Sequence, residues 1–211
     1  MAHDSIKLDI DSIVSRLGCP KDGYIVSRAI ALHQRKGIPL NHVLAEALIA
    51  HYLKFERGFE RVDIEKSINK HSCDVYAESG ALRICVEIEF NFVPPQYASE
   101  ASEYLVARHV KKVLSLASCP NLMLSFAYPR YCVPSVPIEL LRPPSSRNLD
   151  RLRELIYVAR KYFPIEMESI ELLRNACVHS IMIFDIAKSK VYELTPQTAE
   201  VLITLYDAFL V

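Results

Sequence analysis

The alternation of apolar and polar residues predicts two helices and then three strands in the first half of the chain. Apolar residues recur at helical spacing over residues 22–35 and again over residues 41–56. Strand-like runs follow at 62–68, 72–78 and 82–92. In the third run, apolar positions alternate with polar ones, so Glu87 and Glu89 are expected on one face of a sheet.

The second half predicts further helices and strands around a connecting loop. Pro94 and Pro95 end the third strand, and a helix over 99–117 and a strand over 122–128 follow. A Pro- and Ser-rich loop over 129–146 then leads to helices over 147–162 and 170–177. The chain continues with a hairpin of 180–187 with 190–194, and with a last helix that begins at Thr195 and Pro196. This order predicts an α/β fold, with a mixed central sheet flanked by helices.

The connection between the second and third strands sets the expected position of an acidic residue. Ser79 and Gly80 are a plausible two-residue turn, because Gly tolerates the positive φ that such turns need. Asp74 then opposes Cys85 and is a diagonal neighbour of Glu87, roughly 7 to 8 Å away at the backbone. Two carboxylates at that spacing can bind one cation.

These carboxylates suit phosphodiester hydrolysis, which needs charge neutralised on the phosphate and a deprotonated water. Mg²⁺ supplies both, and it prefers one or two protein carboxylates together with waters and substrate oxygens. Asp74 and Glu87 fit that preference. Alternating Glu residues on a strand are also typical of a solvated face, which is the alternative interpretation of Glu87 and Glu89.

The order of these residues resembles the PD-(D/E)XK nuclease superfamily, especially archaeal Holliday-junction resolvases. The resemblance covers residues 40–128: a helix with Glu46, a strand with Asp74, Glu87-Ile88-Glu89 on the next strand, then a helix and a strand. It implies a restriction-endonuclease-like αβββαβ core, within residues 1–130 together with the N-terminal helix. Residues 131–211 are then a C-terminal helix-hairpin-helix-strand extension packed on the core. It also suggests an archaeal or archaeal-virus source.

The resemblance assigns roles to single residues. Asp74, Glu87 and the carbonyl of Ile88 would hold Mg²⁺ or Mn²⁺, and Glu46 would be an outer ligand or orient the attacking water. Glu89 stands where the family usually has Lys, so it would act as a base or as a ligand to a second metal. A cation from the following helix, at the level of Arg108 and Lys111, could replace the lysine. Phosphate contacts are expected from Arg108, Lys111 and Lys112.

The resemblance therefore predicts a metal-dependent DNA endonuclease that acts as a homodimer on branched or structured duplex. Lys plus Arg equals Asp plus Glu at 25 each, so any DNA contact must come from a local patch. The missing lysine favours a catalytically inactive DNA-binding or assembly module as the alternative. The neutral charge favours a third class, an interaction protein with no nucleic-acid role.

Other residues carry weaker expectations. No apolar run is long enough to span a bilayer and the first residues lack a signal-peptide core, so an intracellular, cytoplasmic protein is expected, in the host cytoplasm if it is viral. The six cysteines form no zinc-like cluster and are expected as small buried hydrophobes. A Cys119–Cys132 disulfide is the alternative. His71 and His109 are expected to be polar surface residues.

Overall fold

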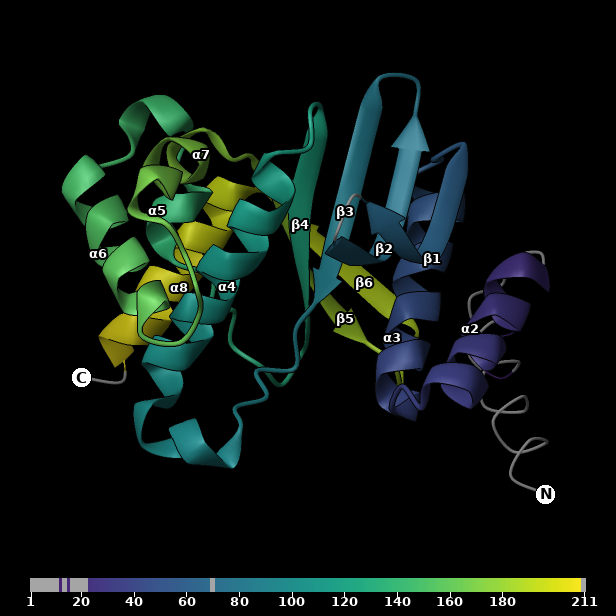
Figure 1. Cartoon of the computed structure of the whole chain (residues 1–211). Coiled ribbons are helices and arrows are strands. Elements are labelled where there is room, and N and C mark those ends of the chain that lie inside the picture. Colours follow the sequence, from purple (N-terminus) through teal and green to yellow (C-terminus); the bar gives the residue numbers. More distant parts are fainter. Residues whose placement is uncertain (1–11, 13–14, 16–22, 69–70, 210–211) are drawn as a thin grey trace.

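A six-stranded mixed sheet with helices on both faces forms the centre of the molecule (Figure 1). This computed structural model describes residues 12, 15, 23–68 and 71–209. The strands lie in sequence order across the sheet: β1 (Arg61–Ile68), β2 (His71–Ser79), β3 (Leu82–Ile88), β4 (Leu122–Pro129), β5 (Val178–Asp185) and β6 (Lys190–Leu194). The predicted α/β class with a mixed, helix-flanked sheet is confirmed.

The strand directions follow from the connections between them. β1, β2 and β3 form an antiparallel meander, whereas β3, β4 and β5 run parallel, and β6 pairs antiparallel with β5. Parallel neighbours need a crossover connection, and helices provide both crossovers here. The helices therefore cover the sheet and enclose two apolar layers.

Figure 1 shows α2 and α3 on one face of the sheet and the other labelled helices on the opposite face. A π-helical turn, Tyr52–Glu56, extends α3, and a 3₁₀ turn, Pro95–Glu100, precedes α4. The helices are α2 (Gly23–Lys36), α3 (Leu40–His51), α4 (Ala101–Ala117), α5 (Ile138–Leu141), α6 (Leu149–Arg160), α7 (Ile170–Asn175) and α8 (Pro196–Phe209). Short 3₁₀ turns also occur at Pro144–Ser146 and Met167–Ser169.

Strand β3 separates the two apolar layers. Ile84, Val86 and Ile88 pack in the layer beneath α2 and α3. Cys85 packs in the other layer, with side chains of α4 and α6. The period of two that the sequence shows in this strand therefore marks its two faces.

The hairpin between β2 and β3 differs from the prediction by two residues. Ser79 pairs with Leu82, so Gly80 and Ala81 form the turn, and Tyr76 rather than Asp74 opposes Cys85. Gly80 has a φ of 57°, and the turn begins at this residue because a two-residue hairpin turn needs positive φ at its first position. The predicted pairing of Asp74 with Cys85 is therefore wrong.

The C-terminal half continues the same sheet. β5 and β6 confirm the predicted hairpin, and the Pro-rich stretch expected to be a loop contains α5. In the described part of the chain, which ends at residue 209, no strand follows α8, so the predicted final strand is wrong. β3 also ends at Ile88, before the predicted end at residue 92, because the backbone then departs toward α4.

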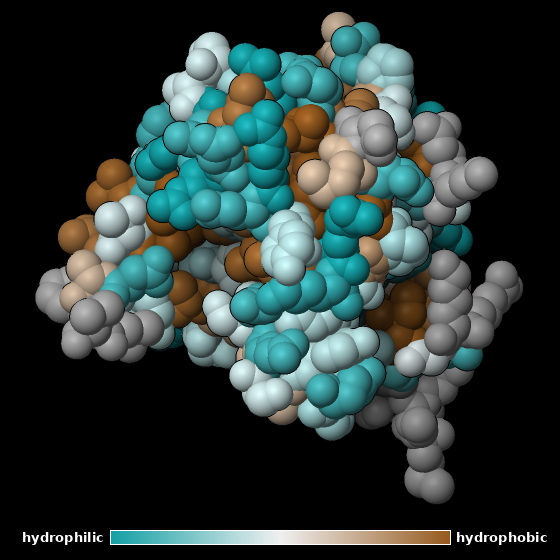
Figure 2. All heavy atoms as spheres, turned by 60° about the vertical axis from the view of Figure 1, so that its left-hand side comes forward, coloured by the Kyte–Doolittle hydropathy of each residue, from teal (hydrophilic) through white to brown (hydrophobic). Residues whose placement is uncertain are grey.

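The described helices are short relative to a bilayer. None of them is both long and apolar enough to cross a membrane. The face that Figure 2 brings forward is mainly hydrophilic, with apolar side chains in separate patches.

Candidate functional site

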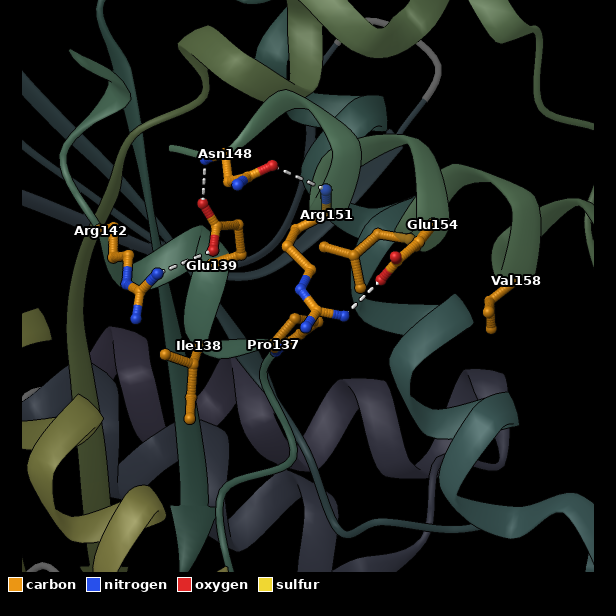
Figure 3. Close-up of a pocket in the computed structure, with 9 residues that line it drawn as sticks. Pro137, Ile138, Glu139, Arg142, Asn148, Arg151, Glu154 and Val158 are labelled. Atoms are coloured by element: carbon orange, nitrogen blue, oxygen red, sulfur yellow. Dashed lines mark hydrogen bonds and ion pairs between the residues drawn. The ribbon is translucent and has the colours of Figure 1, made fainter. Parts of the chain in front are cut away.

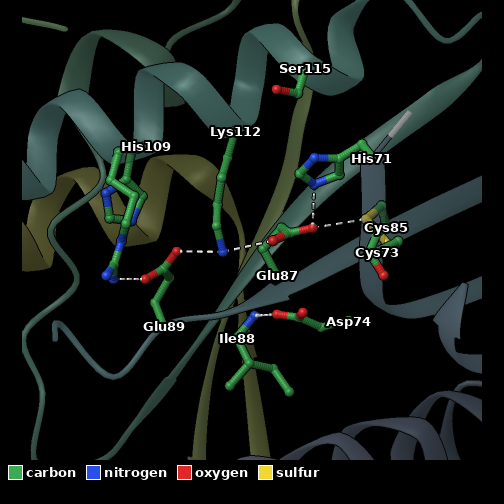
Figure 4. Close-up of polar contacts among 12 residues, drawn as sticks. His71, Cys73, Asp74, Cys85, Glu87, Ile88, Glu89, His109, Lys112 and Ser115 are labelled. Carbon is green, nitrogen blue, oxygen red and sulfur yellow. Dashed lines mark hydrogen bonds and ion pairs between the residues drawn. A yellow bond between two sulfur atoms is a disulfide. The ribbon is translucent and has the colours of Figure 1, made fainter. Parts of the chain in front are cut away.

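Glu87 and Glu89 form a buried charge network with helix α4 (Figure 4). Lys112 Nζ lies 2.7 Å from Glu87 Oε2 and 2.8 Å from Glu89 Oε1. Arg108, one helical turn before Lys112, makes an ion pair with Glu89 and donates a 2.7 Å hydrogen bond to the carbonyl of Phe92. Both carboxylates are almost completely buried, so their predicted placement on one face holds but the solvated interpretation does not.

Glu89 and Lys112 stay charged near neutral pH because each faces an opposite charge. Burial by itself would raise the pKa of Glu89, but the nearby positive charges, with Lys112 contributing most and Arg108 adding to it, outweigh burial and the pKa lies below its usual value. Burial would lower the pKa of Lys112, and the charges of Glu87 and Glu89 instead raise it above the ordinary lysine value. Buried ions are stable only in such paired arrangements.

The three basic residues of α4 have different surroundings. Arg108 and Lys112 point toward the sheet, whereas Lys111 is exposed and its Nζ lies 4.8 Å from the ring centre of Phe163. The sequence placed Arg108 and Lys111 level with the acidic residues. The phase of the helix brings Lys112 to them instead.

Glu46 and Asp74 belong to a second cluster, on the α3 side of the sheet. One ligand atom from each of His42, Glu46, Glu65 and Asp74 lies within 4.8 Å of every other. His42 Nε2 is 3.3 Å from Glu46 Oε1 and 3.8 Å from Asp74 Oδ1. Asp74 Oδ2 accepts a 2.7 Å hydrogen bond from the amide of Ile88, which links this cluster to β3.

Local structure explains why these four residues meet. His42 and Glu46 are four residues apart on α3 and share one face of the helix. Glu65 has a φ of 51°, unusual for a residue with a side chain, and it lies between the β1–β2 pairs that flank Asp74. The ladder is therefore interrupted where β1 and β2 approach α3.

Glu46 carries the least satisfied charge of this cluster. Its side chain is fully buried, and its Oε2 has no hydrogen-bond partner among the described residues. Burial raises the pKa of Glu46 to about 7, despite the nearby imidazole of His42. Native proteins pair nearly all such buried oxygens, so this one points to an interaction with an additional group.

In the metal-free protein His42 is protonated at neutral pH, so a cation that binds in this cluster must displace the imidazole proton. Burial would lower the pKa of His42, but hydrogen bonds with Asp74 and Glu46 raise it to about 10. Burial would raise the pKa of Asp74, but the His42 hydrogen bond and the Lys112 charge outweigh it, so the pKa is lowered. Carboxylates with one imidazole form a donor set for divalent cations such as Mn²⁺.

The four acidic residues expected to act together thus divide between two clusters. Glu46 and Asp74 contact α3, and Glu87 and Glu89 contact α4. The backbone amide of Ile88 donates a hydrogen bond to Asp74. Sequence reasoning missed His42, although a His four residues before Glu46 on a helix is a detectable signal; Glu65 had no comparable signal.

Two histidines and two cysteines also differ from expectation. His71 Nε2 lies 3.1 Å from Glu87 Oε1, and His109 is fully buried with its Nε2 2.7 Å from the Tyr128 hydroxyl. Burial lowers the pKa of His109 to about 4, so this ring is neutral. A disulfide joins Cys73 on β2 to Cys85 on β3, and Cys132 is a free thiol, so the alternative Cys119–Cys132 bond is not formed.

A pocket between α5 and α6 lies away from both clusters (Figure 3). Its volume is about 550 Å³. The charged side chains on its wall pair with one another: Arg151 with Glu154 at 2.7 Å and Arg142 with Glu139 at 3.1 Å. Because these charged groups already have partners, the pocket is a weaker candidate for a functional site than the cluster around Glu46.

Comparisons with known proteins do not assign either cluster. No family model, curated protein or solved structure matches this chain significantly.

Proposed function

We propose that this protein is a divalent-cation-dependent DNA endonuclease of the PD-(D/E)XK type, which hydrolyses phosphodiester bonds with Mg²⁺ or Mn²⁺. The observation that carries the proposal is the buried, unpartnered Oε2 of Glu46, in a cluster where His42 and Asp74 also offer ligand atoms. Asp74 and Glu46 hold the cation in this proposal, and His42 becomes a further ligand when the cation displaces its proton. The bound cation would polarise the phosphate and lower the pKa of a water.

The topology supports the same proposal. One helix, three antiparallel strands, a helix and a parallel strand follow one another from α3 to β4, as in a restriction-endonuclease-like αβββαβ core. In this arrangement Asp74 is the acidic residue of the second strand. Its orientation is set by the Ile88 amide, which leaves Oδ1 facing His42.

Lys112 is our candidate for the missing lysine. Its positive charge lowers the pKa of Asp74, and 20% of its side chain is exposed to solvent. Glu87 and Glu89 hold its ammonium group in place. In this proposal a lysine from helix α4, positioned by these two carboxylates, takes the role of the lysine that the family usually has on the strand. In the proposed reaction Lys112 stabilises charge that develops on the phosphate.

A catalytically inactive DNA-binding module is the second candidate. The same ion pairs favour it, because an ammonium group bound by two carboxylates is less available to a phosphate. This candidate predicts DNA binding without cleavage. The cation cluster then has a structural role.

Cleavage and metal affinity test the proposal together. Linear, nicked, flap and four-way DNA are incubated with Mg²⁺ or Mn²⁺, and calorimetry measures Mn²⁺ affinity. Asp74→Asn keeps the acceptor for the Ile88 amide but loses the charge, so we expect at least about 10-fold weaker Mn²⁺ binding and loss of most cleavage. Asp63→Asn, the same change on β1, is the matched control.

Two results decide between the candidates. Cleavage by the wild type that Asp74→Asn abolishes and Asp63→Asn retains supports the nuclease. DNA binding at low salt with no cleavage of any DNA form supports the inactive module. If neither cleavage nor DNA binding occurs, both candidates fail.

We also propose a homodimer, because cutting both strands of a duplex calls for two symmetric sites. Helix α8 supports it: Ala199 and Ile203 are buried against the sheet, and a second set of apolar side chains faces solvent, namely Val201, Leu202, Leu205 and Tyr206. Sedimentation should show a dimer at micromolar concentration and a monomer for Leu205→Glu. Leu172→Glu, at an exposed position of α7, should remain dimeric, and a monomeric wild type contradicts this proposal.

A further inference from the structure

Four potential metal ligands gather on the α4 side of strands β2 and β3. The sulfur atoms of Cys73 and Cys85 and a carboxylate oxygen of Glu87 lie within 4.8 Å of one another. Glu87 Oε1 is 3.5 Å from Cys85 Sγ and 3.1 Å from His71 Nε2 (Figure 4). One carboxylate oxygen therefore lies between a sulfur and an imidazole nitrogen.

We propose that the reduced protein binds one Zn²⁺ through the thiolates of Cys73 and Cys85, Glu87 Oε1 and His71 Nε2. This site is separate from the His42–Glu46–Asp74 cluster and does not depend on nuclease activity. The Cys73–Cys85 disulfide is its closed, oxidised form.

The spacing of the donors fits tetrahedral zinc. Bond lengths of about 2.0 to 2.3 Å place neighbouring ligand atoms of such a site about 3.3 to 3.8 Å apart. The two distances from Glu87 Oε1, 3.5 and 3.1 Å, are close to that range. The two sulfur atoms must separate, and the imidazole of His71, which lies outside the group formed by Cys73, Cys85 and Glu87, must move toward them. The cysteines lie on neighbouring strands, with their Cα atoms 5.8 Å apart.

The charges of the site balance as well. Two thiolates and Glu87 carry three negative charges, which Zn²⁺ and the ammonium of Lys112 neutralise. Lys112 contacts the other carboxylate oxygen, Oε2, so Oε1 is left for the metal. Both cysteines are fully buried, and His71, with 23% of its side chain exposed, provides a path from solvent.

Formation of the zinc site first requires a dithiol reductant, and dithiol proteins keep thiols reduced in a reducing compartment. The dithiol transfers two electrons and two protons to the Cys73–Cys85 bond, the S–S bond breaks, and the reductant becomes a disulfide. Zn²⁺ then displaces both thiol protons and forms two Zn–S bonds. Metal binding therefore releases two protons for each ion if His71 is already neutral.

Cobalt provides a direct probe of thiolate ligation. The protein is purified in a dithiol, freed of it without oxygen, and titrated with Co²⁺ and then Zn²⁺. We expect the thiolate-to-cobalt absorption in the near ultraviolet to saturate at one thiolate-bound Co²⁺ for each chain, and to be lost when Zn²⁺ displaces Co²⁺. The oxidised protein should not develop the band.

Variants locate the site and separate it from the proposed nuclease cluster. Cys85→Ser should weaken Co²⁺ binding by more than about 100-fold, beyond the loss expected from an outer-shell partner. His71→Asn should weaken it too. Cys132→Ser, which removes a thiol elsewhere, and Glu46→Gln, which alters the other cluster, should both keep the full band.

Circular dichroism shows whether each sample is folded. A folded, reduced wild type without the cobalt–thiolate band overturns the proposal, as does a band that Cys132→Ser abolishes. If reduction unfolds the wild type and neither Co²⁺ nor Zn²⁺ refolds it, the proposal is also overturned.

Discussion

The ammonium group of Lys112 lies 2.7 Å from a carboxylate oxygen of Glu87, inside the layer between helix α4 and the sheet. Glu87 exposes only 2% of its side chain, so this contact places a positive charge beside a buried anion. The next ion pairs, with Glu89 and Arg108, extend the same network. The stability of the fold and the chemistry of the site therefore depend on the same side chains.

Replacement of Lys112 by Met should be strongly destabilising. The change leaves Glu87 without its ammonium partner, and loss of one partner of a buried pair costs about 3 to 5 kcal/mol. Lys111→Met, the same change one position earlier, alters an exposed side chain and should cost less than about 1 kcal/mol. Urea unfolding of both variants measures the difference, and equal midpoints would show that the network does not stabilise the fold.

Glu89→Lys tests the meaning of the missing lysine. The family resemblance alone predicts that this change raises activity. In the structure the new ammonium would lie beside Arg108 and Lys112, so three cations would share a buried region, and we expect lower stability than for Glu89→Gln. Thermal unfolding of the two variants decides, and a Glu89→Lys protein that is both stable and more active contradicts the network as described.

The stability of the metal-free protein should depend on the protonation of Glu46. Its pKa is about 7 in the folded protein against an ordinary value of 4.5, so the unfolded chain loses the proton first as pH rises. The contribution of protonated Glu46 to the free energy of unfolding is therefore largest below pH 4.5, and it is lost as pH rises toward 7. Between pH 4.5 and 6.5 the loss amounts to about 2 kcal/mol.

Glu46→Gln removes this titration. Urea unfolding in a chelator should show that the variant gains about 2 kcal/mol relative to the wild type when pH changes from 4.5 to 6.5. His42 contributes little over this range, because its pKa is about 10 in the folded protein and the unfolded chain loses the proton only near the ordinary value of 6.5. A difference that is constant with pH would show that Glu46 titrates normally.

Reduction of the Cys73–Cys85 bond without metal should lower the free energy of unfolding. The bond closes a loop with a sequence separation of 12, for which loop-closure entropy in the unfolded chain is worth about 3 kcal/mol. Urea unfolding with and without a dithiol, in a chelator, gives the difference. The Cys73→Ser, Cys85→Ser double variant should show no effect of the dithiol.

Local sequence patterns determined the class of the fold and much of its element order. The alternation in β3 predicted that Glu87 and Glu89 share a face, and the helical and strand periods predicted the β5–β6 hairpin and helix α4. These features depend on residues that are near one another in the chain. Period and turn chemistry are sufficient to place them.

Tertiary structure decided which charges meet. The start of the turn at Gly80 moved Asp74 by two positions relative to β3, and the phase of α4 brought Lys112 rather than Lys111 to the carboxylates. The packing of α3 set His42 and Glu46 beside Asp74. Register and helix rotation are selected by the packing of distant segments on the sheet, so the local pattern determines the face on which a residue lies and the assembled core determines its partner.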